Sequence, residues 1–274
     1  VGVPVMTDST VTTETALAAQ RAVQQTLAAQ RIEGWEPQPA HIVELGALAT
    51  GALAFDDYLA RCREQYPSEP VRRRFLRRRV PYLIPGTSVL RNNFGIHDGP
   101  GLAAAEFQVT AGRMVLWHGR QPGSQPDIDV RALHRELFDD VYSWAGELRT
   151  VDLRRGDSAF TWQVDVAAGI HEIQLAATEL ADLGAGYDNP RLAWELSRIY
   201  ARYNQIHPFR EGNGRTGMLL LHALAARCGR QLDFTTVTRA AWYSAARDSM
   251  PRHRDGYPSH RPFLWLLNPA VKSP

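Results

Sequence analysis

The sequence of 274 residues has little cysteine and no long apolar run, and each shortage excludes a class of protein. The two cysteines, Cys62 and Cys228, do not form a metal-ligand spacing and are too few for a disulfide-stabilised secreted scaffold. No apolar run approaches the roughly 18 residues that span a bilayer. The N-terminus also lacks the basic start and apolar core of a signal peptide. We therefore expect a cytoplasmic protein with no membrane partner.

The formal net charge is only +2, so the molecule as a whole is not built to bind nucleic acid. The exception is segment 72–79, which has six arginines in eight positions. This run could contact an acidic partner, but no aromatic residues extend it as a binding patch, which favours a solvated connector. Hydrophobic content of 44% is ordinary for a soluble globular protein of one large domain, or of a main domain with an appendage.

In contrast, residues 207–215 concentrate several chemical groups. The sequence His-Pro-Phe-Arg-Glu-Gly-Asn-Gly-Arg places an imidazole, a carboxylate, an amide and a guanidinium around two glycines, and an apolar helical pattern follows at once. Glycines at the start of a helix leave backbone N–H groups free, and these groups together with the helix dipole favour an anion such as phosphate. The pattern predicts a site of phosphate chemistry rather than a loop that only caps a helix.

The other periodicities predict a mostly α chain with one β-hairpin. The hairpin is expected from strand-like alternation at 148–153, a turn at 155–158 and a second run at 159–163. Asp129 is a plausible N-cap. Helices are expected at 12–33, 39–66 (interrupted near Gly46 and Gly51), 102–117, 130–145, 164–183, 190–204, from the motif to Gly229 and at 233–250. One more apolar segment follows at 262–267.

The N-terminal helices are too few to bury a core of their own, so they should pack on the remainder. We expect a helical segment at 1–66, an Arg-rich linker at 67–80 and a main domain at 81–274.

Residues 207–215 match, at every position, the signature His-Pro-Phe-x-Glu-Gly-Asn-Gly-Arg of the Fic family. Segment 137–149 resembles the helix-to-strand passage that leads into the Fic flap, and Gly-Asp-Ser-Ala-Phe at 156–160 resembles the flap itself. Further likenesses lie at 82–106 and 204–206, so the resemblance covers about residues 80–270. It implies a Fic-type helical bundle with one short β-hairpin flap.

The resemblance also implies an activity, the transfer of AMP from ATP to a hydroxyl side chain of a target protein. His207 would be the general base, because an imidazole titrates near working pH. Glu211 would hold Mg²⁺, a hard cation that prefers oxygen ligands. The phosphates would be bound by Gly212, Asn213, Gly214 and Arg215.

Two further positions define the reaction class and the target site. The kinase-like Doc toxin carries a lysine where this chain has Gly214, so the glycine favours AMP transfer over phosphate transfer. The flap would bind the target protein by adding a strand of it, largely independently of sequence. The implied flap residues are Gly156, Asp157, Ser158, Ala159 and Phe160.

Residues 16–60 resemble the small helical antitoxin that pairs with one class of Fic toxins, here fused ahead of the Fic-like domain. Segment 27–34 looks like the inhibitory helix, which ends in a Glu-Gly pair and makes Glu33 the candidate inhibitory residue. The alternative is an Ala-rich helix that merely ends at a glycine. The antitoxin pattern has Ser or Thr four residues before the glutamate, whereas this chain has Ala29.

Many Fic motifs also carry a second arginine, three residues after the first, that contacts the γ-phosphate and pairs with the inhibitory glutamate. This chain has Met218 there. Three functions therefore remain open. The chain could be an AMP-transferase restrained by its own helix, with Glu33 paired to Arg215 instead. It could use another nucleotide or a pyrophosphate-linked donor. It could also be a catalytically inactive binding module, although the four intact polar residues of the motif argue against that.

Overall fold

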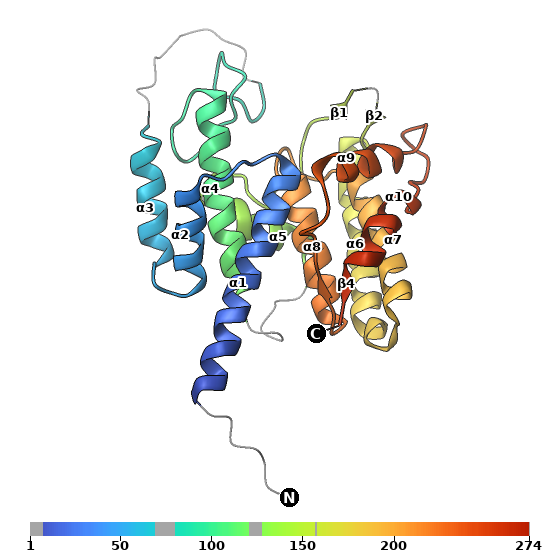
Figure 1. Ribbon diagram of the computed structural model, residues 1–274. Helices are drawn as coiled ribbons and strands as arrows, with labels where there is room; N and C mark the ends of the chain where they lie inside the picture. Colours follow the sequence, from blue (N-terminus) through green and yellow to red (C-terminus); the bar gives the residue numbers. More distant parts are fainter. Residues whose placement is uncertain (1–7, 69–79, 121–127, 157, 274) are drawn as a thin grey trace, which may run out of the picture.

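The computed structural model describes residues 8–68, 80–120, 128–156 and 158–273, and the described part is a mostly helical fold, as expected (Figure 1). The arginine run at 72–79 and the flap residue Asp157 lie outside the described residues. The helices are α1 (Asp8–Glu33), α2 (Pro39–Ala49), α3 (Phe55–Gln65), α4 (Gly99–His118), α5 (Val130–Phe138), α6 (Val166–Leu183), α7 (Asn189–Ile206), α8 (Asn213–Arg227), α9 (Arg239–Asp248) and α10 (Arg261–Ala270). Short 3-10 turns lie at Gln163–Asp165 and Gly184–Gly186.

Helix α8 is the centre of the molecule, and every residue from Thr216 to Ala225 is buried. A helix that is buried all round must be covered on every side, whereas a surface helix buries a single stripe. Helices α1, α5, α6 and α7 pack around it. Because α8 begins at Asn213, this packing places the start of the helix, with the motif loop before it, at one end of the core.

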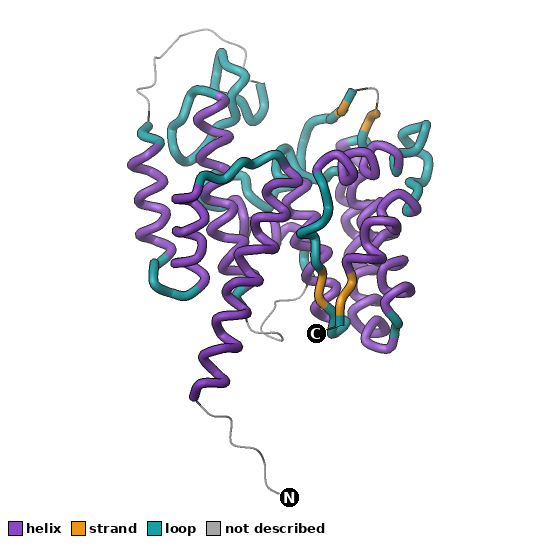
Figure 2. The backbone as a smooth tube through the Cα atoms, in the orientation of Figure 1, coloured by secondary structure: helices purple, strands orange, loops and turns teal. Residues whose placement is uncertain are grey.

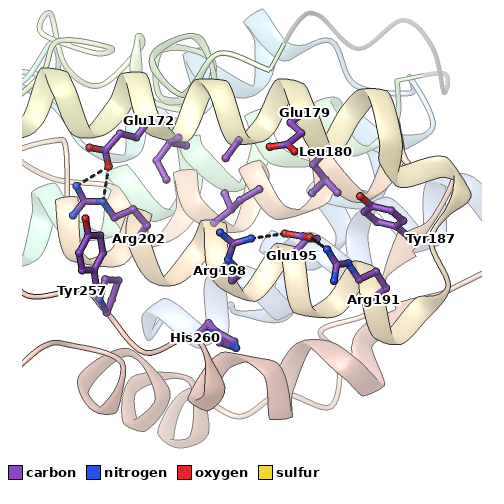
Figure 3. A pocket seen from close by; sticks show the side chains of 14 residues that line it. Glu172, Glu179, Leu180, Tyr187, Arg191, Glu195, Arg198, Arg202, Tyr257 and His260 are labelled. Atoms are coloured by element: carbon purple, nitrogen blue, oxygen red, sulfur yellow. Dashed lines mark hydrogen bonds and ion pairs between the residues drawn. The ribbon is translucent and has the colours of Figure 1, made fainter.

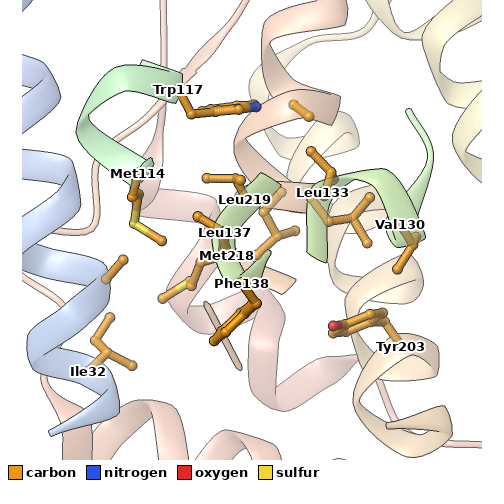
Figure 4. Close-up of a cluster of buried hydrophobic side chains, with 14 of the residues drawn as sticks. Ile32, Met114, Trp117, Val130, Leu133, Leu137, Phe138, Tyr203, Met218 and Leu219 are labelled. Atoms are coloured by element: carbon orange, nitrogen blue, oxygen red, sulfur yellow. The ribbon is translucent and has the colours of Figure 1, made fainter. Parts of the chain in front are cut away.

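Helix α1 packs against α4, α2, α8 and α9, so the N-terminal segment shares the core of the rest of the chain. Its last two turns bury Leu27, Ala29 and Ile32. Figure 4 shows Ile32 in the same buried cluster as Phe138 and Met218, which come from α5 and α8. The end of α1 (blue) therefore lies beside the start of α8 (orange) in Figure 1. The division of the chain into three parts stays a prediction.

Local sequence signals account for several boundaries. Asp129 is the N-cap of α5, as predicted, and its side chain accepts a hydrogen bond from the Arg131 N–H at 2.8 Å. The helical run from residue 39 is divided in two between Ala49 and Phe55, and Gly51 in this gap adopts φ +74°. The helix expected at 233–250 begins only at Arg239, because Asp233 instead accepts the N–H of Thr235 in a local turn.

Two predictions near the flap were wrong. The helix expected at 130–145 ends at Phe138, and turns follow up to Gly146, which has φ +79°. Residues 148–153 are a loop rather than a strand, because the buried side chain of Arg149 turns inward to bond backbone carbonyl groups. The hairpin itself is confirmed, but it is shorter: β1 (Arg154–Arg155) pairs antiparallel with β2 (Ser158–Ala159).

A second strand pair was not predicted. Strand β3 (Gln231–Leu232) pairs antiparallel with β4 (Val271–Lys272), and it ties the C-terminal end of the described chain to the segment after α8. Figure 2 shows the two strand pairs at different ends of the molecule. Two-residue strands have too little alternation to be recognised from sequence. None of the described helices is long and apolar enough to cross a membrane.

Candidate active site

The loop of residues 207–212 connects α7 to α8 and turns sharply at both ends. His207 caps α7 in the left-handed conformation (φ 49°, ψ 64°), and Gly212 caps α8 at φ 79°. A left-handed non-glycine residue costs on the order of 1–3 kcal/mol and persists only where neighbouring groups hold it. At Gly212 a side chain is also excluded by space, because an added Cβ would lie 2.3 Å from the Phe138 ring.

Arg149 holds the backbone of His207. Its Nε donates to the His207 carbonyl oxygen at 2.8 Å, and its Nη2 donates to that of Ile206 at 3.1 Å. The same guanidinium also donates to Val151 and Thr161, and only 2% of the residue is exposed. A cation at the last carbonyls of α7 also suits the helix dipole. Arg149 is thus a positioning residue for the candidate base, which the sequence analysis did not identify.

The imidazole of His207 lies against the flap. It stacks on the Phe160 ring with centroids 3.8 Å apart and planes 7° apart. The structure therefore brings together the predicted base and a predicted flap residue. Burial lowers the pKa of His207 well below its usual value, and the charges of Arg155 and Arg149 lower it further. A neutral imidazole at neutral pH is ready to accept a proton.

His134 fixes the middle of the motif loop. The Gly146 N–H donates to its Nδ1 at 2.8 Å, so Nε2 carries the proton and donates to the Glu211 carbonyl oxygen at 3.1 Å. Its ring stacks on Phe209 with centroids 3.9 Å apart. Burial lowers the pKa of His134 to about 3, so it stays neutral. Sequence reasoning missed this residue, because nothing local connects it to the motif.

Asn213 closes the loop on itself. Its side-chain Oδ1 accepts the Phe209 N–H at 2.9 Å, and its Nδ2 donates to the Phe209 carbonyl oxygen at 2.8 Å. Tyr203 donates from its hydroxyl to the Asn213 carbonyl oxygen at 2.9 Å. These bonds give Asn213 a structural role in addition to its predicted phosphate contact, which stays a prediction.

Arg215 is buried, with 3% of the residue exposed, and it forms an ion pair with Glu106 of α4. It also donates to the Thr110 hydroxyl at 3.1 Å and lies 4.8 Å from the centre of the Phe138 ring. Burial alone would lower the pKa of Arg215, but the carboxylates of Glu106 and Glu211 raise it, so the guanidinium stays charged. The predicted phosphate-binding arginine is thus committed to a carboxylate in this arrangement.

The ion pair belongs to a buried network that reaches α1. Tyr142 donates from its hydroxyl to Glu106, and Gln30 of α1 donates to the Thr110 hydroxyl at 3.1 Å. Gln30 lies one turn before Glu33, so the network connects Arg215 to the same helix end that carries the candidate inhibitory residue. The roles of Glu106, Tyr142 and Gln30 were not predicted from the sequence.

Glu33, the last residue of α1, places its carboxylate over Gly214 in the first turn of α8. A Cβ added to Gly214 would lie 2.0 Å from Glu33 Oε1 and 2.4 Å from its Cδ. This is the position in which the sequence predicts an anion. Burial raises the pKa of Glu33, whereas the positive charges of Arg215, Arg155 and Arg239 lower it.

The space around this carboxylate is small. A cavity of about 20 Å³ lies between Glu33, His207 and Gly214, which is little more than the volume that one water needs. A larger pocket of about 690 Å³ adjoins it between the flap and α9. The two share four residues, Arg155, Asn204, Tyr243 and Ala246. Apart from the Asn204 lead-in to the motif, sequence reasoning did not connect these residues with the site.

Glu211 suits the metal that the resemblance implies. It keeps 44% of its side chain exposed, and its Oε1 accepts the Gly212 N–H at 3.0 Å. Among the described residues, no three histidine, cysteine or acidic side chains gather as a metal site. One accessible carboxylate beside a phosphate site fits Mg²⁺, which takes one or two protein carboxylates together with substrate phosphates.

A further pocket of about 430 Å³ lies between α6 and α7, away from the motif (Figure 3). Its charged side chains neutralise one another, because Arg202 pairs with Glu172 at 2.7 Å and Arg198 with Glu195 at 3.0 Å. None of its lining residues belongs to the motif or the flap. The candidate active site is therefore the smaller cavity at the start of α8.

This chain resembles known proteins over a region that includes the motif loop. A model of the Fic/DOC family matches residues 127–225. The probable protein adenylyltransferase Fic of Salmonella typhimurium is 32% identical over 168 residues, which cover 61% of this chain and 82% of that protein.

Two solved structures share the fold. One is the BepC protein of Bartonella tribocorum with bound AMPPNP, at 20% identity and a TM-score of 0.59, covering 70% of this chain and 97% of that one. The other is a Fic-domain signalling protein of Bacteroides thetaiotaomicron, at 13% identity and a TM-score of 0.54, covering 92% of this chain and 84% of that one. Because the match to the Salmonella protein covers most of that protein at this identity, the chain described here belongs to the Fic/DOC family.

Proposed function

We propose that this chain is a protein adenylyltransferase that transfers AMP from ATP to a hydroxyl side chain of a target protein. The hydroxyl oxygen attacks the α-phosphorus, the bond to the bridging oxygen breaks, pyrophosphate leaves, and the hydroxyl proton passes to His207. The observation that carries the proposal is a neutral imidazole held beside the N-terminus of a buried helix. Relatives named as probable protein adenylyltransferases support it.

Each motif residue would contribute through its position. His207 accepts the proton, and Arg149 and Phe160 fix its backbone and ring. The N–H groups of the first turn of α8 stabilise negative charge at the α-phosphate. Glu211 would hold Mg²⁺, which when bound neutralises phosphate charge. The pocket of about 690 Å³ beside the flap has room for the nucleoside, because ligand pockets begin near 300 Å³.

The flap would bind the target. Strands β1 and β2 form a two-stranded ladder whose outer edges can accept another strand. Because Phe160 follows β2 and stacks on His207, a hydroxyl on an added strand would be carried close to the base. Backbone pairing explains why the reaction can be inferred more closely than the target sequence.

We further propose that the fused helix inhibits the enzyme. The Glu33 carboxylate lies at the start of α8, where a phosphate of the donor must bind, and the remaining cavity of about 20 Å³ cannot hold a phosphate group. Like charges exclude one another from a shared site, so ATP must displace Glu33 before transfer can begin. The helix would thus act as an internal antitoxin.

The test uses ATP labelled at the α-phosphate or at the γ-phosphate, with lysate as the source of targets. We expect His207-dependent transfer of the α-label only, and a higher rate for Glu33→Gly than for the wild type. Glu36→Gly is the matched control, because Glu36 is exposed and lies three residues beyond the end of α1. Transfer of the γ-label would contradict AMP transfer. An unchanged rate for Glu33→Gly would contradict inhibition.

A donor other than ATP is favoured by one observation. Met218 replaces the second arginine of the motif and is completely buried, so it cannot contact a phosphate. Parallel reactions with labelled GTP, CTP, UTP and a dinucleotide test this alternative, because one of them would then outcompete ATP. Absence of His207-dependent transfer from every donor would leave a binding module.

A further inference from the structure

Neither motif position expected to contact the outer phosphates of a nucleotide, 215 or 218, offers an uncommitted guanidinium. Met218 is buried in the core cluster of Figure 4. Arg215 forms its ion pair with Glu106, and it is not among the residues that line the cavity at His207. A nucleoside triphosphate carries most of its charge on the β- and γ-phosphates. An enzyme that uses one therefore needs cations near these two phosphates, supplied here by residues outside the motif.

Two arginines from outside the motif lie near the site, Arg155 at the cavity itself and Arg239 beside the residue that follows Glu33. Arg155 of β1 lines both the small cavity and the larger pocket, and its Cζ lies 5.5 Å from the centre of the Tyr243 ring. Arg239 begins α9, and its Cζ lies 5.0 Å from the same ring. A Cβ added to Gly34 would lie 3.0 Å from the Arg239 Cζ, so this guanidinium reaches the residue that follows Glu33. Tyr243 therefore aligns one arginine of the flap and one of α9.

Both guanidiniums are available to an anion. Within the described ranges, neither Arg155 nor Arg239 forms a salt bridge with a carboxylate, and both residues are exposed. Burial raises the pKa of Glu33, and the charges of Arg155 and Arg239 are among those that oppose this rise. Arginine is the side chain best suited to phosphate, because its planar fork can donate two parallel hydrogen bonds.

We propose that Arg155 and Arg239 replace the missing second arginine: they bind the β- and γ-phosphates of a nucleoside triphosphate donor, and when the donor is absent their positive charges attract the Glu33 carboxylate without a direct ion pair. This inference rests on the proposed function and specifies its donor class. It also explains how inhibition can persist without the motif arginine, since Glu33 has cations on the flap and on α9.

The experiment measures equilibrium binding by titration calorimetry with AMPPNP and with AMP, each with Mg²⁺, in a Glu33→Gly background. Arg155→Met and Arg239→Met should each weaken AMPPNP binding about tenfold and leave AMP binding within about twofold, because AMP lacks the outer phosphates. Arg191→Met is the matched control. It removes an exposed arginine on α7, paired with Glu195, and should change neither affinity.

The inference is overturned if neither substitution weakens AMPPNP binding, or if AMP and AMPPNP lose affinity equally. Lysine variants at both positions check folding, because they keep the charge and should lose less affinity than the methionine variants. Binding is measured without catalysis, so the proposed function fails separately. Phosphate-dependent binding with no label transfer would contradict the adenylyltransferase alone, whereas transfer with arginine-independent binding would contradict only the inference.

Discussion

Substitution of Gly214 by alanine tests whether Glu33 occupies the start of α8. Gly214 lies in the first turn of the helix without a positive φ, so alanine fits its backbone. Alanine should even be favoured there by up to about 1 kcal/mol, because it loses less conformational entropy than glycine. Its Cβ, however, would lie 2.0 Å from Glu33 Oε1, so the carboxylate must leave.

The size of the expected change in unfolding free energy follows from the stabilisation that is lost when the Glu33 carboxylate leaves the start of α8. A carboxylate at a partly buried helix N-terminus contributes about 1–2 kcal/mol, so its expulsion offsets the gain from alanine. We expect Gly214→Ala to change the free energy of unfolding by about −1 to 0 kcal/mol in the wild type, and to raise it by up to about 1 kcal/mol in a Glu33→Ala background. The coupling energy between the two positions is then about 1–2 kcal/mol.

The assay is a double-mutant cycle by urea unfolding of the wild type, both single variants and the double variant. Gly46→Ala in α2 is the control, because nothing lies within 4 Å of the Cβ it would add, so its effect should add to that of Glu33→Ala. A coupling energy at Gly214 no larger than that at Gly46 would refute the placement of Glu33.

The remaining predictions concern the groups that support the site. Arg149→Lys should destabilise the fold by about 2–3 kcal/mol and slow transfer at least tenfold, because lysine cannot bond the same carbonyl groups. Urea unfolding and label transfer measure the two effects, and wild-type values for both would contradict the positioning role of Arg149. Burial lowers the pKa of His118 and His134 to about 3 each. The unfolded chain therefore binds protons first as pH falls below about 6.5, and stability should drop by about 2 kcal/mol per histidine between pH 7 and pH 5; equal urea midpoints at the two pH values would exclude this. Tyr142→Phe leaves Glu106 one donor short and should cost about 1–3 kcal/mol in urea unfolding, and a loss below about 0.5 kcal/mol would show that the bond is replaced.

The sequence predicts most clearly what depends on neighbouring residues. The motif loop lies where glycines and an apolar helix pattern place it, and the Asp129 cap is confirmed because an N-cap is a contact across two or three residues. Helix α8 was expected from its apolar pattern, although the pattern does not reveal that the helix is covered on all sides. Local periodicity thus predicts most of the elements and places the nine motif residues in one loop and the first turn of the helix that follows it.

Long-range polar contacts could not be predicted in the same way. Arg149 bonds a carbonyl 58 residues away, His134 one that is 77 residues away, and Glu106 an arginine that is 109 residues away. No periodic pattern connects such partners, and a buried polar group shows its role only when the group that satisfies it is known. The error at 148–153 has this origin, because a strand-like alternation there is overruled by the partners of Arg149.

The start of α8 connects inhibition to donor binding through shared cations. Glu33 and the outer phosphates of a triphosphate would use the same two arginines, Arg155 and Arg239, so strengthening either interaction strengthens the competitor as well. If the inhibited arrangement outnumbers the open one 99 to 1, only about one molecule in 100 can bind ATP. The apparent affinity for ATP then falls about 100-fold. In a motif with its own second arginine, this coupling is set within α8. In this chain the two arginines lie on the flap and on α9. A target that moves the flap would therefore change the interaction of Arg155 with Glu33 and with the donor at the same time.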